Sequence, residues 1–345
     1  MPAERVVAHG PGRVNLIGEH TDYNGGLSLP FAIAAGVTVT ATARADGLVV
    51  ARALDRGESD RFALADPEPA PGWRAFLRGT VAELAAAGLP VRPAELEIHG
   101  DVPEGAGLSS SAALGVALCL ALLALGGAPD ADRLELARVC SRVENAWVGA
   151  RTGLLDQIAS LFGRDGHALR VDFRTLDVAP VALQTGSWRL VTVGSGEARL
   201  HAASGYNERR RECAVAAERL GLRSLRDATA AAAAELPDPL CRRVRHVIEE
   251  NGRVDATVAA LRAGDLRAVG ALLDASHASL RDLYDASTPA VERTVAALRE
   301  AGAAGARMVG GGFGGHVLAL LPPDAGAPAG AREVAPAAGA RLLQS

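Results

Sequence analysis

The chain has 345 residues, enough for two ordinary domains, and its 49% hydrophobic and 22% charged content is typical of a protein that folds around a core. The formal net charge of −4 provides no basic field for nucleic acid, so we expect no polyanionic partner. All 36 basic residues are arginines. The absence of lysine excludes a Walker A loop, a protein-kinase site and a Schiff-base enzyme, each of which requires a lysine side chain.

The cysteines and the longest apolar run indicate the cellular compartment in which the protein is expected. The four cysteines are scattered, form no CxxC pair and are expected to be reduced: Cys119, Cys140, Cys213 and Cys241. The first residues contain no apolar signal region, and the longest apolar run, Ala112 to Leu125, is too short to cross a bilayer. We therefore expect a cytoplasmic protein without a membrane partner. We also expect a monomer, although no sequence pattern reports the oligomeric state.

Apolar spacing and turn residues predict the elements of the first half in order. We expect strands at 5–9, 37–43 and 48–51, the last two paired as a hairpin around Asp46-Gly47. A helix over 73–87, a short strand at 96–99 and a buried helix over 112–125 follow. Asp132 is expected to cap a helix that runs towards Val148, and Thr152-Gly153 to precede another helix through residue 162.

The second half begins with strand-like segments at 168–173 and 188–193, with a domain boundary expected between them near Pro180. Helices are expected over 206–220 and 266–283, and a third begins at Ser287-Thr288-Pro289 and ends near 302. A strand pair at 307–309 and 316–321 then flanks a glycine turn. The tail from Pro322 is either a mobile end or a final helix and strand that cover the sheet.

A glycine- and serine-rich loop leads into the buried helix. It runs from Pro103 to Ser111 and ends in three consecutive serines. Small residues let a phosphate approach the backbone, and the helix N-terminus supplies unpaired N–H groups and the positive end of the dipole. Without a lysine, such a loop would rely on amides, hydroxyls, arginine and a metal ion. The alternative is an ordinary capped helix after a flexible turn.

Two acidic residues occupy apolar helical positions. Glu144 shares a helical stripe with Cys140 and Trp147, where a metal ion would compensate for a carboxylate that is otherwise costly to bury. Asp156 lies among leucine and isoleucine residues in the first turn of its helix. The alternatives are a salt bridge from Glu144 to Arg142 or Arg151, and a capping or dipole role for Asp156.

The densest polar stretch suits a ligand with many hydroxyl groups. Within twelve positions it contains Arg13, Asn15, Glu19, His20, Thr21, Asp22, Tyr23 and Asn24. Interleaved glycines indicate a specifically folded loop rather than a solvated charged one. The late cluster Gly310–Gly315 is either a hairpin turn or a backbone clamp against a ligand.

Together, these clusters resemble the motifs of the GHMP kinase family. Residues 12–26, GRVNLIGEHTDYNGG, are similar to the motif of its galactose-phosphorylating members, and residues 105–111 resemble its phosphate loop. Residues 153–157 resemble its catalytic segment and residues 305–315 its third motif, so the four motifs occur in family order. The implied fold is α+β, with an N-terminal domain (1–180) like ribosomal protein S5 domain 2, a C-terminal ferredoxin-like domain (181–345), and the site between them.

The resemblance also implies an activity: ATP-dependent phosphorylation of the anomeric C1 hydroxyl of galactose, with ATP as co-substrate and Mg²⁺ as cofactor. Asp156 would be the general base, and Arg13 would stabilise the transition state. The sugar contacts would be Glu19, His20, Thr21, Asp22 and Tyr206. The ATP phosphates would lie on Gly105, Ala106, Gly107, Leu108, Ser109, Ser110 and Ser111, and Mg²⁺ on Ser111 and Glu144.

Two other functions remain open at this point. One is a related kinase that acts on another sugar, such as N-acetylgalactosamine or arabinose. The other is a non-catalytic sensor of sugar and ATP. The uninterrupted serines Ser109–Ser111 and the presence of Asp156 argue against the sensor, because relatives of that kind have damaged phosphate loops.

Overall fold

The computed structural model describes residues 4–102, 107–150, 152–197 and 202–343. Its largest sheet has six strands in the order β13-β1-β3-β6-β4-β5. These strands are β13 (Arg341–Leu343), β1 (Arg5–Asn15), β3 (Pro30–Ala43), β6 (Ala94–Gly100), β4 (Leu48–Ala53) and β5 (Glu58–Ala63). Among the described residues, no helix combines the length and the apolar character needed to cross a bilayer.

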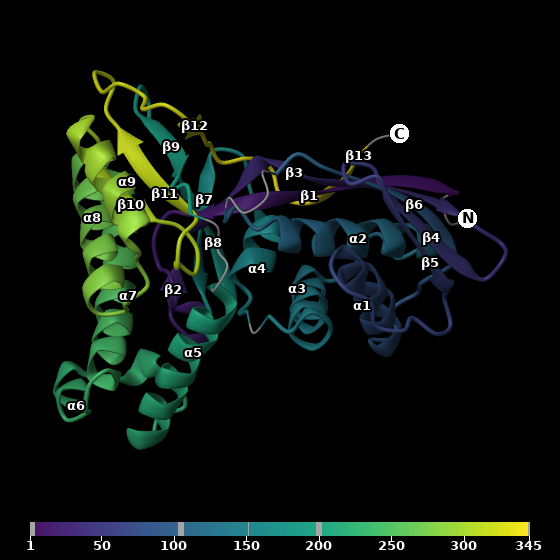
Figure 1. The fold of residues 1–345 in the computed structure, drawn as a ribbon, viewed down its shortest axis with the longest axis horizontal. Helices are drawn as coiled ribbons and strands as arrows, with labels where there is room; N and C mark the ends of the chain where they lie inside the picture. Colours follow the sequence, from purple (N-terminus) through teal and green to yellow (C-terminus); the bar gives the residue numbers. More distant parts are fainter. Residues whose placement is uncertain (1–3, 103–106, 151, 198–201, 344–345) are drawn as a thin grey trace.

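Helices cover one face of this sheet (Figure 1). They are α1 (Trp73–Ala86), α2 (Ser110–Gly126), α3 (Arg133–Arg142), the π-helical segment η2 (Val143–Val148) and α4 (Leu155–Phe162). Helix α2 packs against β1, β3 and the other helices, and its residues from Leu118 to Leu125 are buried all round. A helix that is apolar on every side requires such an enclosed position, so α2 is the centre of the first core.

A four-stranded antiparallel sheet and a set of helices form the other half of the molecule (Figure 1). The sheet order is β10 (Gly305–Met308), β11 (His316–Leu321), β9 (Arg189–Gly194) and β12 (Arg332–Glu333). The helices are α5 (Ala202–Arg219), α6 (Ala230–Ala234), α7 (Leu240–Ala263), α8 (Leu266–Asp282) and α9 (Pro289–Glu300). The short 3₁₀ turn η3 (Leu225–Asp227) follows α5.

A small sheet of β2 (Leu27–Ser28), β7 (His167–Asp172) and β8 (Asp177–Ala182) lies where the two halves meet. Two predicted helix starts, at Asp132 and Thr288, are confirmed by the structure. Asp132 caps α3 by accepting a hydrogen bond from Glu135 N–H at 2.8 Å. Thr288 caps α9, with Pro289 in its first turn. The predicted antiparallel pair around the Gly310–Gly315 turn is also confirmed, as β10 and β11.

The predicted hairpin of 37–43 and 48–51 is wrong. Both strands form, but β6 lies between them: it pairs antiparallel with β3 and parallel with β4. The hairpin partner of β4 is instead β5. Alternating apolar residues indicate that a segment is a strand with one buried face, but they do not indicate its neighbour.

The expected domain division after residue 180 falls inside β8, which continues to Ala182. The tail also differs from a final helix, because it forms the short strands β12 and β13, and β13 returns to pair with β1. We therefore propose a boundary between β8 and β9, with β13 belonging to the first domain.

Replacing either of two helical glycines by alanine should change the free energy of unfolding, in opposite directions. A Cβ atom at Gly270 of α8 would lie 2.5 Å from the carbonyl oxygen of Ala304, whereas one at Gly252 of α7 would meet nothing within 4 Å. Gly252→Ala should therefore raise the free energy of unfolding by about 0.5–1 kcal/mol, because alanine favours the helix. Gly270→Ala should lower it by about 1–3 kcal/mol through overpacking. Urea unfolding of the two variants checks both signs, and equal effects would contradict the packing of α8 on β10.

Candidate active site

An ion pair between a buried arginine and a half-buried aspartate lies at the centre of the site. Arg13, near the end of β1, donates from Nε to Asp156 Oδ1 at 2.6 Å, and its Nη2 also lies 2.6 Å from the same oxygen. Asp156 is in the first turn of α4. Arg13 is only 6% exposed, and although burial opposes its charge, the carboxylates of Asp156, Glu19 and Glu144 raise its pKa. The ion pair therefore joins β1 to α4.

The described part of the predicted phosphate loop is attached to this pair. Arg13 donates from Nη1 to the carbonyl of Gly107 at 2.7 Å and from its backbone N–H to the carbonyl of Leu108 at 3.0 Å. Ser109 precedes α2 in a left-handed conformation, with φ of 62°, and its hydroxyl donates to Asp156 Oδ2 at 2.5 Å. Strained backbone of this kind at a non-glycine residue is often found at functional sites.

The other residues of the predicted phosphate loop differ in their position and exposure. Ser110 and Ser111 form the first turn of α2, where backbone N–H groups lack helical partners. Ser110 is exposed and Ser111 is half-buried. Gly105 and Ala106, which were expected to contact ATP, lie outside the described residues. The hydroxyl of Ser109 is directed to Asp156, and the contact of Ser109 with the phosphates of ATP stays a prediction.

Glu144 is buried in η2 beside the start of α2. Its Oε2 accepts hydrogen bonds from the Thr152 hydroxyl and from Gln157 Nε2, the latter at 2.9 Å. Burial is the largest cause that raises the pKa of Glu144 to about 7, and the negative charge of Asp156 adds to it. The expected alternative, a salt bridge to Arg142, is wrong, because Arg142 pairs with Glu83 and Glu135. Arg151 lies outside the described residues.

Glu19 belongs to the polar loop between β1 and β2 and is held by the third motif. Its Oε1 accepts a hydrogen bond from the backbone N–H of Gly310 at 2.7 Å and lies 3.2 Å from Nη2 of Arg307. Arg307, which is 0% exposed, also donates from Nη1 to the carbonyls of Asn15 and Leu16. The polar loop is therefore fixed by groups that are distant in the sequence.

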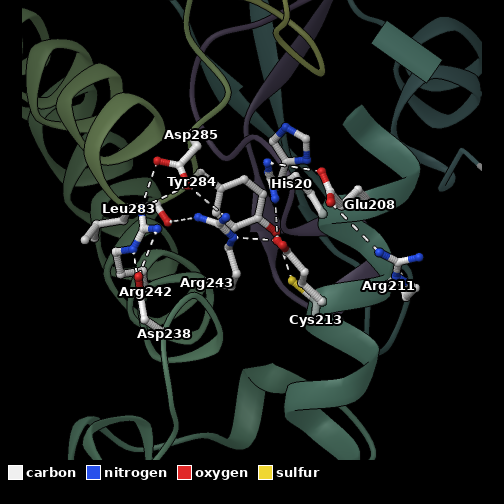
Figure 2. A network of polar contacts seen from close by, with 12 residues as sticks. His20, Glu208, Arg211, Cys213, Asp238, Arg242, Arg243, Leu283, Tyr284 and Asp285 are labelled. Atoms are coloured by element: carbon white, nitrogen blue, oxygen red, sulfur yellow. Dashed lines mark hydrogen bonds and ion pairs between the residues drawn. The ribbon is translucent and has the colours of Figure 1, made fainter. Parts of the chain in front are cut away.

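His20 starts a hydrogen-bonded chain that runs away from the site. Its Nε2 lies 3.2 Å from the carbonyl of Gly311, which can only accept, so Nε2 carries the proton. Its Nδ1 then accepts from the Tyr23 hydroxyl at 2.8 Å. The Tyr23 oxygen lies 3.0 Å from Tyr284 Oη. Tyr284 Oη in turn lies 3.0 Å from Cys213 Sγ (Figure 2). Burial, followed by the nearby His246, lowers the pKa of His20 to about 3, so the ring is neutral.

The predicted sugar contacts therefore fall into two groups. Both ring nitrogens of His20 are occupied by protein groups. The Thr21 side chain is fully buried, and its hydroxyl contacts the carbonyls of Gly18 and Leu27 at 3.0 and 2.7 Å. The His20 ring and the Thr21 hydroxyl thus both have protein partners, and their contact with the substrate stays a prediction. We assign both residues to holding the loop.

Asp22 and Tyr206 are half-buried on the same side of the site. A Cβ atom at Gly153 would lie 1.9 Å from Asp22 Oδ2, so the carboxylate of Asp22 contacts the backbone of the catalytic segment. Burial, and then the negative charge of Asp156, raise the pKa of Asp22 to about 7. Tyr206 of α5 packs over Gly311, where a Cβ atom would lie 2.7 Å from Tyr206 Cδ2. Glycine is required there because the tyrosine ring approaches the backbone.

Sequence reasoning missed several residues that build this site. Arg307 lies within the third motif, and the only feature of the sequence that set it apart was its apolar neighbours. His246, Glu250 and Asn251 of α7 gave no signal, because a run of polar residues in a long helix is typical of a solvated face.

Comparison with known proteins identifies the family. Residues 75–164 match the GHMP kinases N terminal domain, residues 257–341 the GHMP kinases C terminal domain, and residues 2–43 the galactokinase galactose-binding signature. The chain is 44% identical over 327 residues to a galactokinase of Mycobacterium tuberculosis (strain ATCC 25177 / H37Ra), covering 92% of this chain and 90% of that protein. The chain belongs to the galactokinase family. Against a galactokinase of Roseiflexus sp. (strain RS-1) the identity is 42%, over 92% of this chain and 83% of that one.

Solved structures agree with this membership in the galactokinase family. The structure of Lactococcus lactis galactokinase complexed with galactose superimposes with a TM-score of 0.92 at 32% identity, covering 99% of this chain and 96% of that one. The mevalonate kinase of Methanococcus jannaschii matches with a TM-score of 0.67 at 18% identity, over 94% and 93% of the two chains. That second likeness shows the shared fold alone. The predicted α+β, two-domain GHMP kinase fold is thereby confirmed.

The raised pKa of Asp22 predicts a pH effect on stability. Between its ordinary value of 3.8 and about 7, the folded protein keeps a proton that the unfolded chain releases. This contribution is complete below pH 3.8 and is lost as the pH rises through 7. Asp22→Asn should therefore flatten the pH dependence and stabilise the protein more at pH 8 than at pH 5. Urea unfolding at both pH values measures this, with Asp324→Asn on an exposed turn as the control for losing a carboxylate. A parallel curve for Asp22→Asn would contradict the assignment.

Proposed function

We propose that this protein transfers the γ-phosphoryl group of ATP to the anomeric C1 hydroxyl of galactose. The observation that supports this best is the position of Asp156. Arg13 holds one of its oxygens at 2.6 Å and Ser109 holds the other at 2.5 Å, directly beside the N-terminus of α2. A fixed carboxylate next to a phosphate-binding helix end is what a kinase needs to orient an accepting hydroxyl.

The reaction assigns separate tasks to these groups. Asp156 accepts the proton of the C1 hydroxyl as the new oxygen–phosphorus bond forms and the bond to the leaving ADP oxygen breaks. Arg13 keeps Asp156 oriented and offsets negative charge on the transferring phosphoryl group. The backbone N–H groups at the start of α2, from Ser110 and Ser111, contact the phosphates of ATP. Catalysis therefore rests mainly on position and electrostatics.

The residues next to the phosphate loop also fit a magnesium ion. Glu144 Oε1 is buried and, within the described residues, has no hydrogen-bond partner. Ser111 lies beside it, and its hydroxyl favours the charged form of Glu144. Mg²⁺ is commonly held by one or two protein oxygens together with substrate phosphates, so Glu144 and Ser111 would hold it here. When bound, the ion supplies positive charge that neutralises the phosphate oxygens of ATP.

The galactose hydroxyls are expected to contact Glu19, Asp22 and Tyr206. Carboxylates accept hydrogen bonds from hydroxyls, and a tyrosine both donates and accepts. His20 and Thr21 also hold the loop that carries Glu19 and Asp22.

Substrate preference tests the proposed function. Glucose differs from galactose only in the direction of its C4 hydroxyl, and a misdirected hydroxyl leaves a buried polar group unpaired at about 1–3 kcal/mol. The kcat/KM for galactose should therefore exceed that for glucose by more than about tenfold. A coupled ADP-release assay over galactose, glucose, 2-deoxygalactose, N-acetylgalactosamine and arabinose measures this. Equal efficiency with glucose, or a higher one with another sugar, would overturn the choice of galactose.

Replacing the carboxylate of Asp156 or of Glu144 by an amide should have different effects on the kinetics. Asp156→Asn should lower kcat by about 10²- to 10⁴-fold, because the proton acceptor is lost, while the Mg²⁺ titration stays unchanged. Glu144→Gln should shift the Mg²⁺ titration to higher concentration, because one anionic ligand becomes neutral. Steady-state kinetics at varied Mg²⁺ distinguish the two effects. Full activity of the Asp156 variant, or an unshifted titration for the Glu144 variant, removes the corresponding role.

A further inference from the structure

The polar loop that carries the proposed sugar contacts is attached at both ends to one helix of the other domain. We call residues 18–27 the sugar loop. The backbone N–H of Gly18 donates to Glu250 Oε1 at 3.0 Å, and that of Leu27 donates to Asn251 Oδ1 at 2.7 Å. Glu250 and Asn251 are consecutive residues of α7. Two adjacent side chains therefore fix the separation of the ends of the loop.

A third contact from the same helix reaches the loop backbone directly at Glu19. Nε2 of His246 lies 3.2 Å from the carbonyl of Glu19, so the neutral ring donates to it, and its Nδ1 lies 2.8 Å from the Ser279 hydroxyl. His246 is one turn before Glu250 on α7 and lies on the same face. The helix therefore contacts the loop at its two ends and at a proposed sugar-binding residue.

Glu250 is itself rigidly held. It is 0% exposed, its Oε1 accepts from the Ser276 hydroxyl at 2.6 Å, and its Oε2 accepts from Nε of Arg253 at 2.7 Å. Burial opposes its charge, but the positive charge of Arg253 is the largest of the opposing effects that lower the pKa of Glu250 to about 2. The lowered pKa favours the charged carboxylate of Glu250, and a charged acceptor makes a stronger hydrogen bond with the Gly18 N–H than a neutral one.

The sequence of the sugar loop is adapted to this helix. A Cβ atom at Gly26 would lie 2.7 Å from Asn251 Oδ1, so only glycine allows the amide of Asn251 to reach Leu27. Gly18 has φ of 92°, a conformation that favours glycine, and there its N–H points to Glu250. Gly18 and Gly26 therefore allow the hydrogen bonds that the Glu250 and Asn251 side chains of α7 make with the loop backbone.

We propose that Glu250 and Asn251 are positioning residues for sugar binding: they hold the sugar loop in the conformation that presents Glu19 and Asp22 to the substrate. This inference rests on the proposed function for the identity of the substrate. Within the described part of the chain, neither the phosphate loop nor α4 forms a hydrogen bond with Glu250 or Asn251. Their loss is therefore expected to affect sugar binding and to leave ATP binding unchanged.

Four substitutions test the proposal with matched controls. Asn251→Ala removes the acceptor for Leu27, and Asn251→Asp keeps an oxygen in its place. Glu250→Gln removes the charge that Gly18 uses, and Glu249→Gln makes the same change one residue away. Glu249 pairs with Arg245 and Arg253, and no hydrogen bond or ion pair of the described residues joins it to the sugar loop.

Asn251→Ala should raise the KM for galactose by about tenfold, the usual effect of an unpaired buried N–H group, and Glu250→Gln by about fivefold. The KM for ATP should stay within about twofold, and Asn251→Asp and Glu249→Gln should resemble the parent protein. Hydrogen exchange of the Gly18 and Leu27 amides in the free protein should accelerate in Asn251→Ala and Glu250→Gln only.

The exchange measurement needs no substrate, so it separates this inference from the proposed function. If the amides of Gly18 and Leu27 exchange faster in the variants but the parent protein does not phosphorylate galactose, the attachment of the loop to α7 is supported and galactose is rejected as the substrate. Unchanged exchange and an unchanged galactose KM in Asn251→Ala and Glu250→Gln would overturn the positioning role. Equal increases in the KM values for galactose and ATP would also overturn it, because a general loss of structure would then account for the effect.

Discussion

The site depends on a guanidinium group placed where four carboxylates converge. Arg13 neutralises Asp156 directly, and the charges of Glu19 and Glu144 act on it through the low-dielectric interior. Burial is the largest cause that raises the pKa values of Asp22 and Glu144 to about 7, and the negative charge of Asp156 adds to both. Such a cluster is expensive for the protein unless a substrate or a cation shares it. Buried acidic groups of this kind favour ligands that donate hydrogen bonds or carry positive charge.

Much of this arrangement could be predicted from local sequence. Helix starts at Asp132 and Thr288 depend on one side chain and its nearest backbone, so they were predicted correctly. The residues that gather at the centre, such as Arg13 and Asp156, were placed together only through the family resemblance. Periodicity alone could not bring β1 and α4 together, because 143 residues separate the ion pair.

Long-range partners explain what could not be predicted. The fully buried Arg307 and the α7 residue Glu250 appear in the sequence as ordinary charged residues, and their role appears only when the second domain lies against the sugar loop. The mistaken hairpin of β3 and β4 has the same origin, since the strand between them comes about fifty residues later. The ambiguous glycine cluster is resolved in part: it is the turn between β10 and β11, and its backbone packs against Glu19, His20 and Tyr206.

The return of β13 to the first sheet has a consequence for the order in which the chain is made. Residues Val7 to His9 of β1 pair with the strand Arg341–Leu343, and Ala340 N–H donates to the carbonyl of Ser160 in α4, the helix that carries Asp156. During synthesis on the ribosome, β1 is therefore an open sheet edge until Arg341–Leu343 emerge. Open edges are where strands of different molecules join. A nascent chain therefore exposes this edge of its first domain until the second domain has been synthesised, because β13 follows that domain in the sequence.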